Sequence, residues 1–120
     1  MRMWMVDPKT MCQKHLLGEH VELHMFVGHL NRNKSVRGYI ENNCLEATSI
    51  HSRHDELVRE MERRGYKHKS PLPALTLIDW PGYDYKIDRR SAEADLRKRC
   101  FFCRLSAREE PSYGEDTDVP

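Results

Sequence analysis

Apolar side chains recur at helical spacing over three stretches of the chain, and the first stretch is the longest. Asp7 followed by Pro8 is a typical helix start, because the aspartate can cap the helix and proline is tolerated in its first turn. The pattern predicts a helix from Asp7 to about Asn31. One face of this helix carries the apolar residues Leu16, Leu23, Phe26, Val27 and Leu30.

A second helix is predicted after a connection over residues 31–48, which includes one short helix around Val36 to Ile40. Ser52 and Asp55 have the spacing of a capping box, and Gly65 is well placed to end the helix with a left-handed residue. The apolar stripe of this helix consists of Leu57, Val58 and Met61.

The third helix is expected to open at Ser91 and to bury Leu96, Cys100, Cys103 and Leu105. Between the second and third helices, residues 67–90 contain three prolines among apolar residues such as Leu77, Ile78 and Trp80, which predicts an extended segment packed on the helices. The expected fold class is therefore all-α: one compact domain over residues 1–107, with three main helices and long connecting loops. Residues 108–120 are expected to form a disordered acidic tail.

Length and composition fit this interpretation. With 120 residues, 38% hydrophobic and 32% charged, the chain resembles a soluble protein with a single core. It has no apolar run of membrane-spanning length and no apolar signal-peptide core, so we expect a cytoplasmic protein without membrane contact. We also expect a monomer.

The formal charge of +1 is unevenly distributed, since residues 1–105 carry a net +5 and residues 106–120 a net −4. A basic face on the folded part would suit a polyanionic partner, although an ordinary solvated surface would have the same composition. The basic groups that could contact phosphates are Arg32, Lys34, Arg37, Arg63, Arg64, Arg97, Lys98 and Arg99.

Ionisable residues are unusually frequent on the first helix. His15, Glu19 and Glu22 follow at helical spacing and share one face, which is either a candidate active site or a polar stripe. His20 and His24 form a separate pair at the spacing that can hold one metal ion, but the glutamate of the zinc-protease motif is missing next to His20.

The four cysteines of the chain are Cys12, Cys44, Cys100 and Cys103. Only the last two form a Cys-x-x-Cys pair, which by itself is weak support for a zinc site. Two interpretations stay open: buried reduced thiols, or a metal site made by all four cysteines.

Several motifs occur together in a fixed order. They are a short N-terminal arm with Arg2, His-Leu-Leu-x-Glu-x-x-Glu-Leu at 15–23, Lys-Ser-Val-Arg-Gly-Tyr at 34–39, and Arg-x-x-Glu-Leu-Val-x-Glu-x-x-x-Arg-Gly-Tyr at 53–66. Over about residues 1–70 the chain resembles the phage-type pyrimidine-dimer DNA glycosylases, the dimer-specific endonuclease V family. The resemblance implies a compact helical enzyme without a metal cofactor, whose partner is damaged double-stranded DNA.

This resemblance also implies a chemistry and its residues. The family's nucleophile is the α-amine of the N-terminus, assisted by a glutamate that matches Glu22. The register places the nucleophile on Met1, which Arg2 should protect from removal. We expect Arg2, Lys14 and His15 to contact the DNA: Arg2 and His15 match family residues close to the DNA, and Lys14 stands where the family has glutamine. From the basic clusters we add Arg32, Lys34, Arg37 and Arg97 as expected DNA contacts.

The chain departs from the family in residues of substrate recognition. Two arginines beside the family's catalytic glutamate are Val21 and Met25 here. The family's C-terminal aromatic cluster has no counterpart beyond Trp80, Tyr83, Tyr85 or Tyr113. A related lesion or an abasic site is therefore an alternative substrate. A second hypothesis is a non-enzymatic helical module that binds nucleic acid or protein, with or without a stabilising metal.

Overall fold

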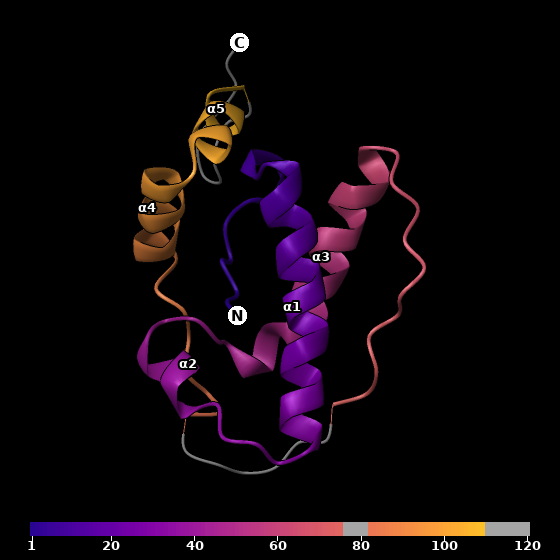
Figure 1. Ribbon diagram of the computed structural model, residues 1–120, viewed down its shortest axis with the longest axis vertical. Helices are drawn as coiled ribbons and strands as arrows, with labels where there is room; N and C mark the ends of the chain where they lie inside the picture. Colours follow the sequence, from indigo (N-terminus) through magenta and orange to yellow (C-terminus); the bar gives the residue numbers. More distant parts are fainter. Residues whose placement is uncertain (76–81, 110–120) are drawn as a thin grey trace.

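A computed structural model describes residues 1–75 and 82–109, and every regular element within them is helical. Figure 1 shows the long helix α1 (Gln13–Asn31) beside α3 (Ile50–Arg63), with α4 (Arg89–Arg99) and α5 (Phe101–Glu109) on the other side of the chain's first residues. The shorter elements are α2 (Arg37–Glu41) and the 3-10 helices η1 (Pro8–Thr10) and η2 (Ala47–Ser49). The all-α prediction is confirmed.

The helix boundaries differ from the prediction at the start of the chain. Asp7 does cap a helix, since its side chain accepts a hydrogen bond from the Lys9 amide at 3.1 Å. That helix is only the short η1, because the buried Met11 is extended and the chain restarts as α1 with Cys12 as its N-cap. The prediction of one helix from Asp7 is therefore wrong by about one and a half turns.

The predicted capping box is also wrong. Helix α3 begins at Ile50, so Ser52 and Asp55 lie inside it, and the Ser52 hydroxyl donates to the Ser49 carbonyl at 3.1 Å. Its predicted end is confirmed. Gly65 has φ +89°, a left-handed conformation that glycine adopts without strain.

The predicted third helix is two helices. It breaks at Cys100, which has extended backbone, so the described part of the chain has four helices of more than two turns instead of three. Leu96 and Cys103 are buried as expected, whereas Leu105 is 38% exposed, because α5 leaves the direction of α4. The expected contacts of Leu77, Ile78 and Trp80, and the expected tail, lie outside the described residues.

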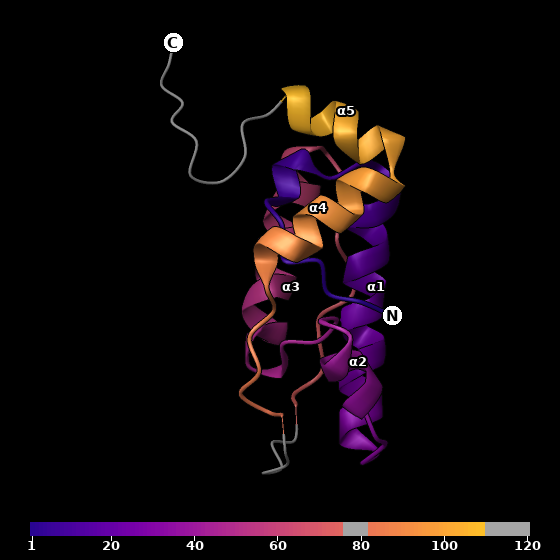
Figure 2. The ribbon, with the colours of Figure 1, turned by 90° about the vertical axis from the view of Figure 1, so that its left-hand side faces the viewer.

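The core lies between α1 and α3 and is completed by residues that precede any helix. Leu16, Leu23 and Phe26 of α1 face Leu57 of α3, and all four are fully buried. The N-terminal segment, residues 1–6, runs beside the middle of α1 in both Figure 1 and Figure 2. Within residues 1–75 and 82–109, no helix has the length and apolar character needed to cross a membrane.

Candidate active site at the first residues of the chain

The N-terminal segment is fixed by hydrogen bonds to residues that are far from it in the sequence. The Met3 amide donates to the Cys44 carbonyl at 2.7 Å, and the Val6 carbonyl accepts from Nη1 of Arg53 at 2.7 Å. Between them, Met5 is buried with φ +58°, a left-handed conformation that is uncommon for methionine. These contacts fix the backbone conformation of the N-terminal segment up to the residues next to Met1.

Arg2 is held on both its backbone and its side chain. Its guanidinium pairs with Asp95 of α4 at 2.7 Å and lies 4.0 Å over the ring of Trp4. Its amide donates a 2.6 Å hydrogen bond to Oε1 of Glu22 on α1. Because consecutive backbone nitrogens are at most about 3.7 Å apart, the α-nitrogen of Met1 lies within about 6.5 Å of that carboxylate oxygen.

Met1 and Glu22 line the same hollow, which has a volume of about 770 Å³. His15 and Asp95 also line it, and so do two basic residues of α4, Lys98 and Arg99. The hollow thus combines a terminal amine, a partly exposed carboxylate and cationic side chains, which are the groups needed for nucleophilic attack beside a phosphate backbone. A second hollow of about 890 Å³ contains Lys9, Lys14 and Phe102 but neither Met1 nor Glu22.

Glu19 does not belong to this arrangement, although its spacing from His15 and Glu22 suggested a common face. Its carboxylate is buried and accepts two hydrogen bonds from Arg53, at 2.7 and 2.9 Å. Burial lowers the pKa of Arg53, but Glu19 and then Glu56 outweigh it and raise the pKa above its ordinary value. The interpretation of Glu19 as part of the site is therefore wrong; it joins α1 to α3.

His15 faces the cysteines on one side and the hollow on the other. Its Nδ1 lies 3.3 Å from Sγ of Cys12 and 3.6 Å from Sγ of Cys103. Burial and then the charge of Lys14 lower the pKa of His15, while Glu22 opposes the shift. A neutral imidazole is the form that accepts a thiol proton or binds a metal ion.

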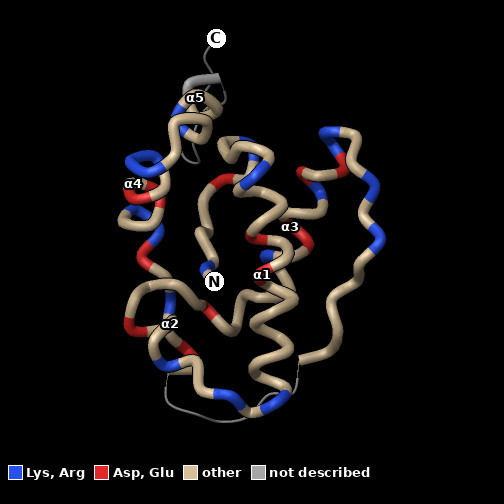
Figure 3. The backbone as a smooth tube through the Cα atoms, in the orientation of Figure 1, with Lys and Arg blue, Asp and Glu red and all other residues tan. Residues whose placement is uncertain are grey.

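Several expected DNA contacts lie away from the hollow with Met1. Arg32 and Lys34 are exposed beyond the end of α1, and Arg37 on α2 is exposed and pairs with Glu41 at 2.7 Å. Arg97 pairs with Glu93 at 2.7 Å on α4. Figure 3 shows that basic positions are spread over the fold with acidic ones among them, and that α4 carries both.

In the basic cluster of α4 the sequence predicts a DNA contact for Arg97, but Lys98 and Arg99 are the residues that line the hollow with Met1. Lys98 and Arg99 follow Arg97 directly, and only the direction of α4 decides which of the three faces the hollow. Asn43 is a further residue of this wall that the sequence did not reveal: its side chain accepts from the hydroxyl of Tyr85 at 2.7 Å. Trp80 and Tyr113 lie outside the described residues.

The predicted histidine pair is part of a larger group. His20 and His24 of α1 meet His54 of α3 and His68 of the segment that follows it, with ring centroids 4.9–5.5 Å apart. Nε2 of His20 and Nε2 of His54 are 3.2 Å apart, so one donates a hydrogen bond to the other and at least one ring is neutral. The predicted partner His24 is not a member of the group that could hold a metal ion here, which consists of His20, His54 and His68.

The alternative of a metal site made by all four cysteines is wrong in one member. Sγ of Cys44 donates to the Asn42 carbonyl at 3.3 Å, and this cysteine is not among the residues that gather near His15. Burial raises the pKa of the Cys100 thiol, but hydrogen bonds, chiefly from Cys103, outweigh it and lower that pKa overall. Burial raises the pKa of Cys103 to about 12. Among the described residues, Cys12, His15, Cys100 and Cys103 form one group that could hold a metal ion, and His20, His54 and His68 form another.

Fold and site define a small helical protein whose first residue lines a polar hollow together with the glutamate Glu22. The model of the family described as pyrimidine dimer DNA glycosylase matches residues 1–74, which is more than half of the chain. The chain therefore belongs to this family of DNA repair glycosylases, and its substrate is DNA. No curated protein and no solved structure matches the chain.

Proposed function

We propose that the protein removes a damaged base and then cleaves the abasic site through an imine formed by the α-amine of Met1. The observation that supports this most is the 2.6 Å hydrogen bond from the Arg2 amide to Glu22, one peptide unit from that amine. An α-amine has an ordinary pKa of about 7.7–8.0, so a useful fraction is neutral and nucleophilic at physiological pH.

The proposed reaction needs no redox partner. The amine nitrogen attacks C1′ of the deoxyribose, the bond to the base breaks, and the base leaves with the electron pair and takes up a proton. Opening of the sugar ring gives an iminium ion, which acidifies the C2′ proton. Loss of that proton expels the 3′ phosphate by β-elimination, and water finally releases the amine.

Glu22 acts in this proposal as the charge that stabilises the cationic sugar and iminium, and as a carrier of protons between steps. A carboxylate about 4 Å from the developing cation contributes about 4 kcal/mol at an effective dielectric constant of about 20, which corresponds to roughly a thousandfold in rate. Glu22→Gln keeps an oxygen that can accept the Arg2 amide, so it removes the charge without removing the anchor.

DNA contacts are proposed for the walls of the hollow: Arg2 and His15 from the family resemblance, and Lys98 and Arg99 from α4. Val21 and Met25, which stand where the family has arginines, are 55% and 45% exposed on α1. This part of the surface therefore offers apolar contact where relatives offer charge, which supports a substrate other than the family's typical dimer, such as a related lesion or an abasic site.

The test is borohydride trapping on duplexes that contain either a pyrimidine dimer or an abasic site. We expect a covalent adduct with the natural chain, no adduct when Gly-Ser precedes Met1, and a loss of cleavage of about 10²–10⁴-fold in Glu22→Gln with DNA binding retained. Glu41→Gln, on the exposed α2, is the matched control and should cleave normally. An adduct that survives N-terminal extension would refute the Met1 amine as the nucleophile and indicate a lysine.

A further inference from the structure

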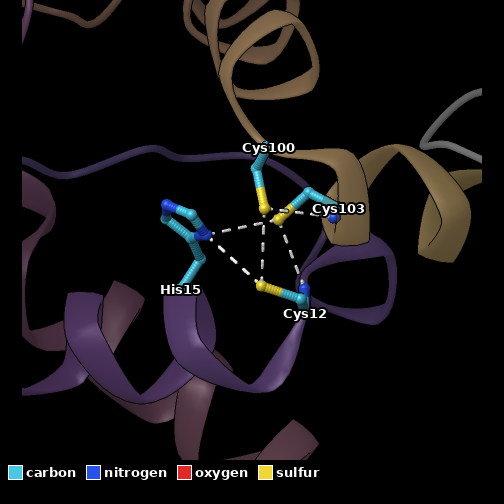
Figure 4. A group of neighbouring side chains, drawn as sticks. All are labelled: Cys12, His15, Cys100 and Cys103. Atoms are coloured by element: carbon cyan, nitrogen blue, oxygen red, sulfur yellow. Dashed lines mark hydrogen bonds between the residues drawn. The ribbon is translucent and has the colours of Figure 1, made fainter.

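Three cysteines and one histidine, from opposite ends of the chain, gather at one point of the fold. Cys12 is the N-cap of α1 and His15 lies in its first turn, while Cys100 separates α4 from α5 and Cys103 lies in the first turn of α5. Figure 4 shows the four side chains pointing toward one another, and their ligand atoms all lie within 4.8 Å.

Three distances between ligand atoms of this group match those of a tetrahedral zinc site. A tetrahedral Zn²⁺ ion, with bonds of about 2.3 Å to sulfur and about 2.0–2.1 Å to nitrogen, holds two sulfurs about 3.8 Å apart and a sulfur and a nitrogen about 3.5 Å apart. The sulfurs of Cys12 and Cys100 are 3.8 Å apart, and Nδ1 of His15 lies 3.3 Å and 3.6 Å from the sulfurs of Cys12 and Cys103.

The sequence spacing of the ligands gives independent support. The pairs Cys12-x-x-His15 and Cys100-x-x-Cys103 each leave two residues between ligands, which is the usual spacing of paired ligands in structural zinc sites. Only the fold joins the two pairs, because 84 residues separate His15 from Cys100 in the numbering.

Backbone amides donate hydrogen bonds to two of the sulfurs. The Cys12 amide donates to the sulfur of Cys103 at 3.3 Å, and the Cys103 amide donates to the sulfur of Cys100 at 3.4 Å. Both ligand pairs also begin at the N-terminal end of a helix, α1 or α5, where the helix dipole stabilises negative charge.

We propose that Cys12, His15, Cys100 and Cys103 form a structural Zn²⁺ site that fastens α4 and α5 to the start of α1. Four protein ligands fill a tetrahedral shell and leave no position for a substrate, so the ion has a structural and not a catalytic role. The cysteine pair lies outside residues 1–74, which match the family model.

The site has a direct connection to the hollow that contains Met1. Helix α4 carries Asp95, which pairs with Arg2, and it ends at the cysteine that begins the ligand pair. A metal ion at this junction would fix the end of α4 and thereby the wall that Asp95, Lys98 and Arg99 contribute to the hollow.

The test is the metal content of the full-length, untagged protein produced with zinc in the medium. We expect about one zinc per chain in the natural protein and in Cys44→Ser, and almost none in Cys100→Ser. Cys44→Ser is the matched control, because this cysteine lies outside the group. A chelator should lower the unfolding temperature of the first two proteins and leave that of Cys100→Ser unchanged.

A second measurement covers the case in which Cys100→Ser does not fold. Metal-free natural protein titrated with Co²⁺ should develop the absorption bands of a tetrahedral thiolate site, saturate at about one equivalent, and lose the bands when Zn²⁺ is added. Equal zinc in Cys100→Ser and natural protein, or absence of both zinc and thiolate-to-cobalt bands in the natural protein, would overturn the proposal.

These measurements are independent of the proposed reaction. Glu22→Gln should keep its zinc while it loses cleavage, so failure of the glycosylase mechanism and failure of the metal site give different results.

Discussion

Replacing Arg53 by methionine tests the most buried electrostatic contact of the fold. The guanidinium makes two hydrogen bonds to Glu19, one to Glu56 at 2.8 Å and one to the Val6 carbonyl, and the Arg53 side chain is 1% exposed. Methionine has a comparable length and no charge. The substitution therefore leaves the Glu19 carboxylate, whose side chain is 0% exposed, without its counter-ion.

Removal of one partner from a buried ion pair costs about 3–5 kcal/mol, because the remaining charge keeps its desolvation penalty. The orphaned Val6 carbonyl adds about 1–3 kcal/mol. Since a domain of this size is stable by about 5–15 kcal/mol, the variant should lose a large part of its stability. The expected fall in unfolding temperature is about 10–25 °C.

Urea and thermal unfolding followed by circular dichroism measure this loss. The matched control is Arg37→Met, since Arg37 also pairs with a glutamate at 2.7 Å but both side chains are exposed, and its unfolding midpoint should stay where it is. The double variant Glu19→Met with Arg53→Met should recover much of the stability, because an apolar pair replaces two buried charges. Arg53→Met as stable as Arg37→Met would refute this reasoning.

Other substitutions test single features of the fold. Gly65→Ala should lower the free energy of unfolding in urea by about 1 kcal/mol, because Gly65 has φ +89°. Gly18→Ala, in open space within α1, should raise the free energy of unfolding by about 0.5–1 kcal/mol. Equal effects of the two substitutions would contradict the left-handed turn at Gly65. Lys98→Ala should weaken binding to damaged and undamaged duplex alike, and it should lower the slope of log K against log salt concentration by about 1. Lys34→Ala should change neither the affinity nor this slope. Fluorescence anisotropy over a salt series measures both. His20 has a folded pKa of about 4 against an ordinary value of 6.5, chiefly through burial and then through its neighbours. As pH falls below 6.5 the unfolded chain therefore takes up the proton first, and stability should decline by about 2 kcal/mol, after allowance for solvent screening, toward pH 4. His20→Gln should flatten this slope between pH 6.5 and 5 in urea unfolding, and an unchanged slope would contradict the assignment. The ionisable groups that face His20, directly or through a neighbour, are His24, His54, His68 and Asp55.

The main helices could be predicted from their periodic apolar stripes, but apart from the end of α3 at Gly65 their boundaries could not. The break at Met11 and Cys12 leaves no mark in the periodicity, since both residues are apolar and fit a continued helix. The break at Cys100 is hidden for the same reason. In both places tertiary contacts override local preference, and both places belong to the group of three cysteines and one histidine.

Of the residues that line the candidate site, those in the N-terminal half of the chain could be predicted from the sequence and those in α4 could not. Met1 and Glu22 follow from the register of the resemblance, and they line the same hollow. Glu19 shows the limit of helical spacing, because its face of α1 is covered by Arg53 of α3. Lys98 and the partnership of His15 with the cysteines depend on how α4 returns to α1, and a spacing pattern does not contain that contact.

The first six residues leave the ribosome before any of their partners. The Cys44 carbonyl, the Arg53 guanidinium and the Asp95 carboxylate are each made later, and Asp95 is synthesised close to the end of the described chain. Until Asp95 is made the leading segment lacks one of its partners, so a polypeptide truncated before α4 lacks the ion pair that holds the Arg2 guanidinium. The N-terminal segment therefore reaches its complete set of contacts only after α4 has been synthesised.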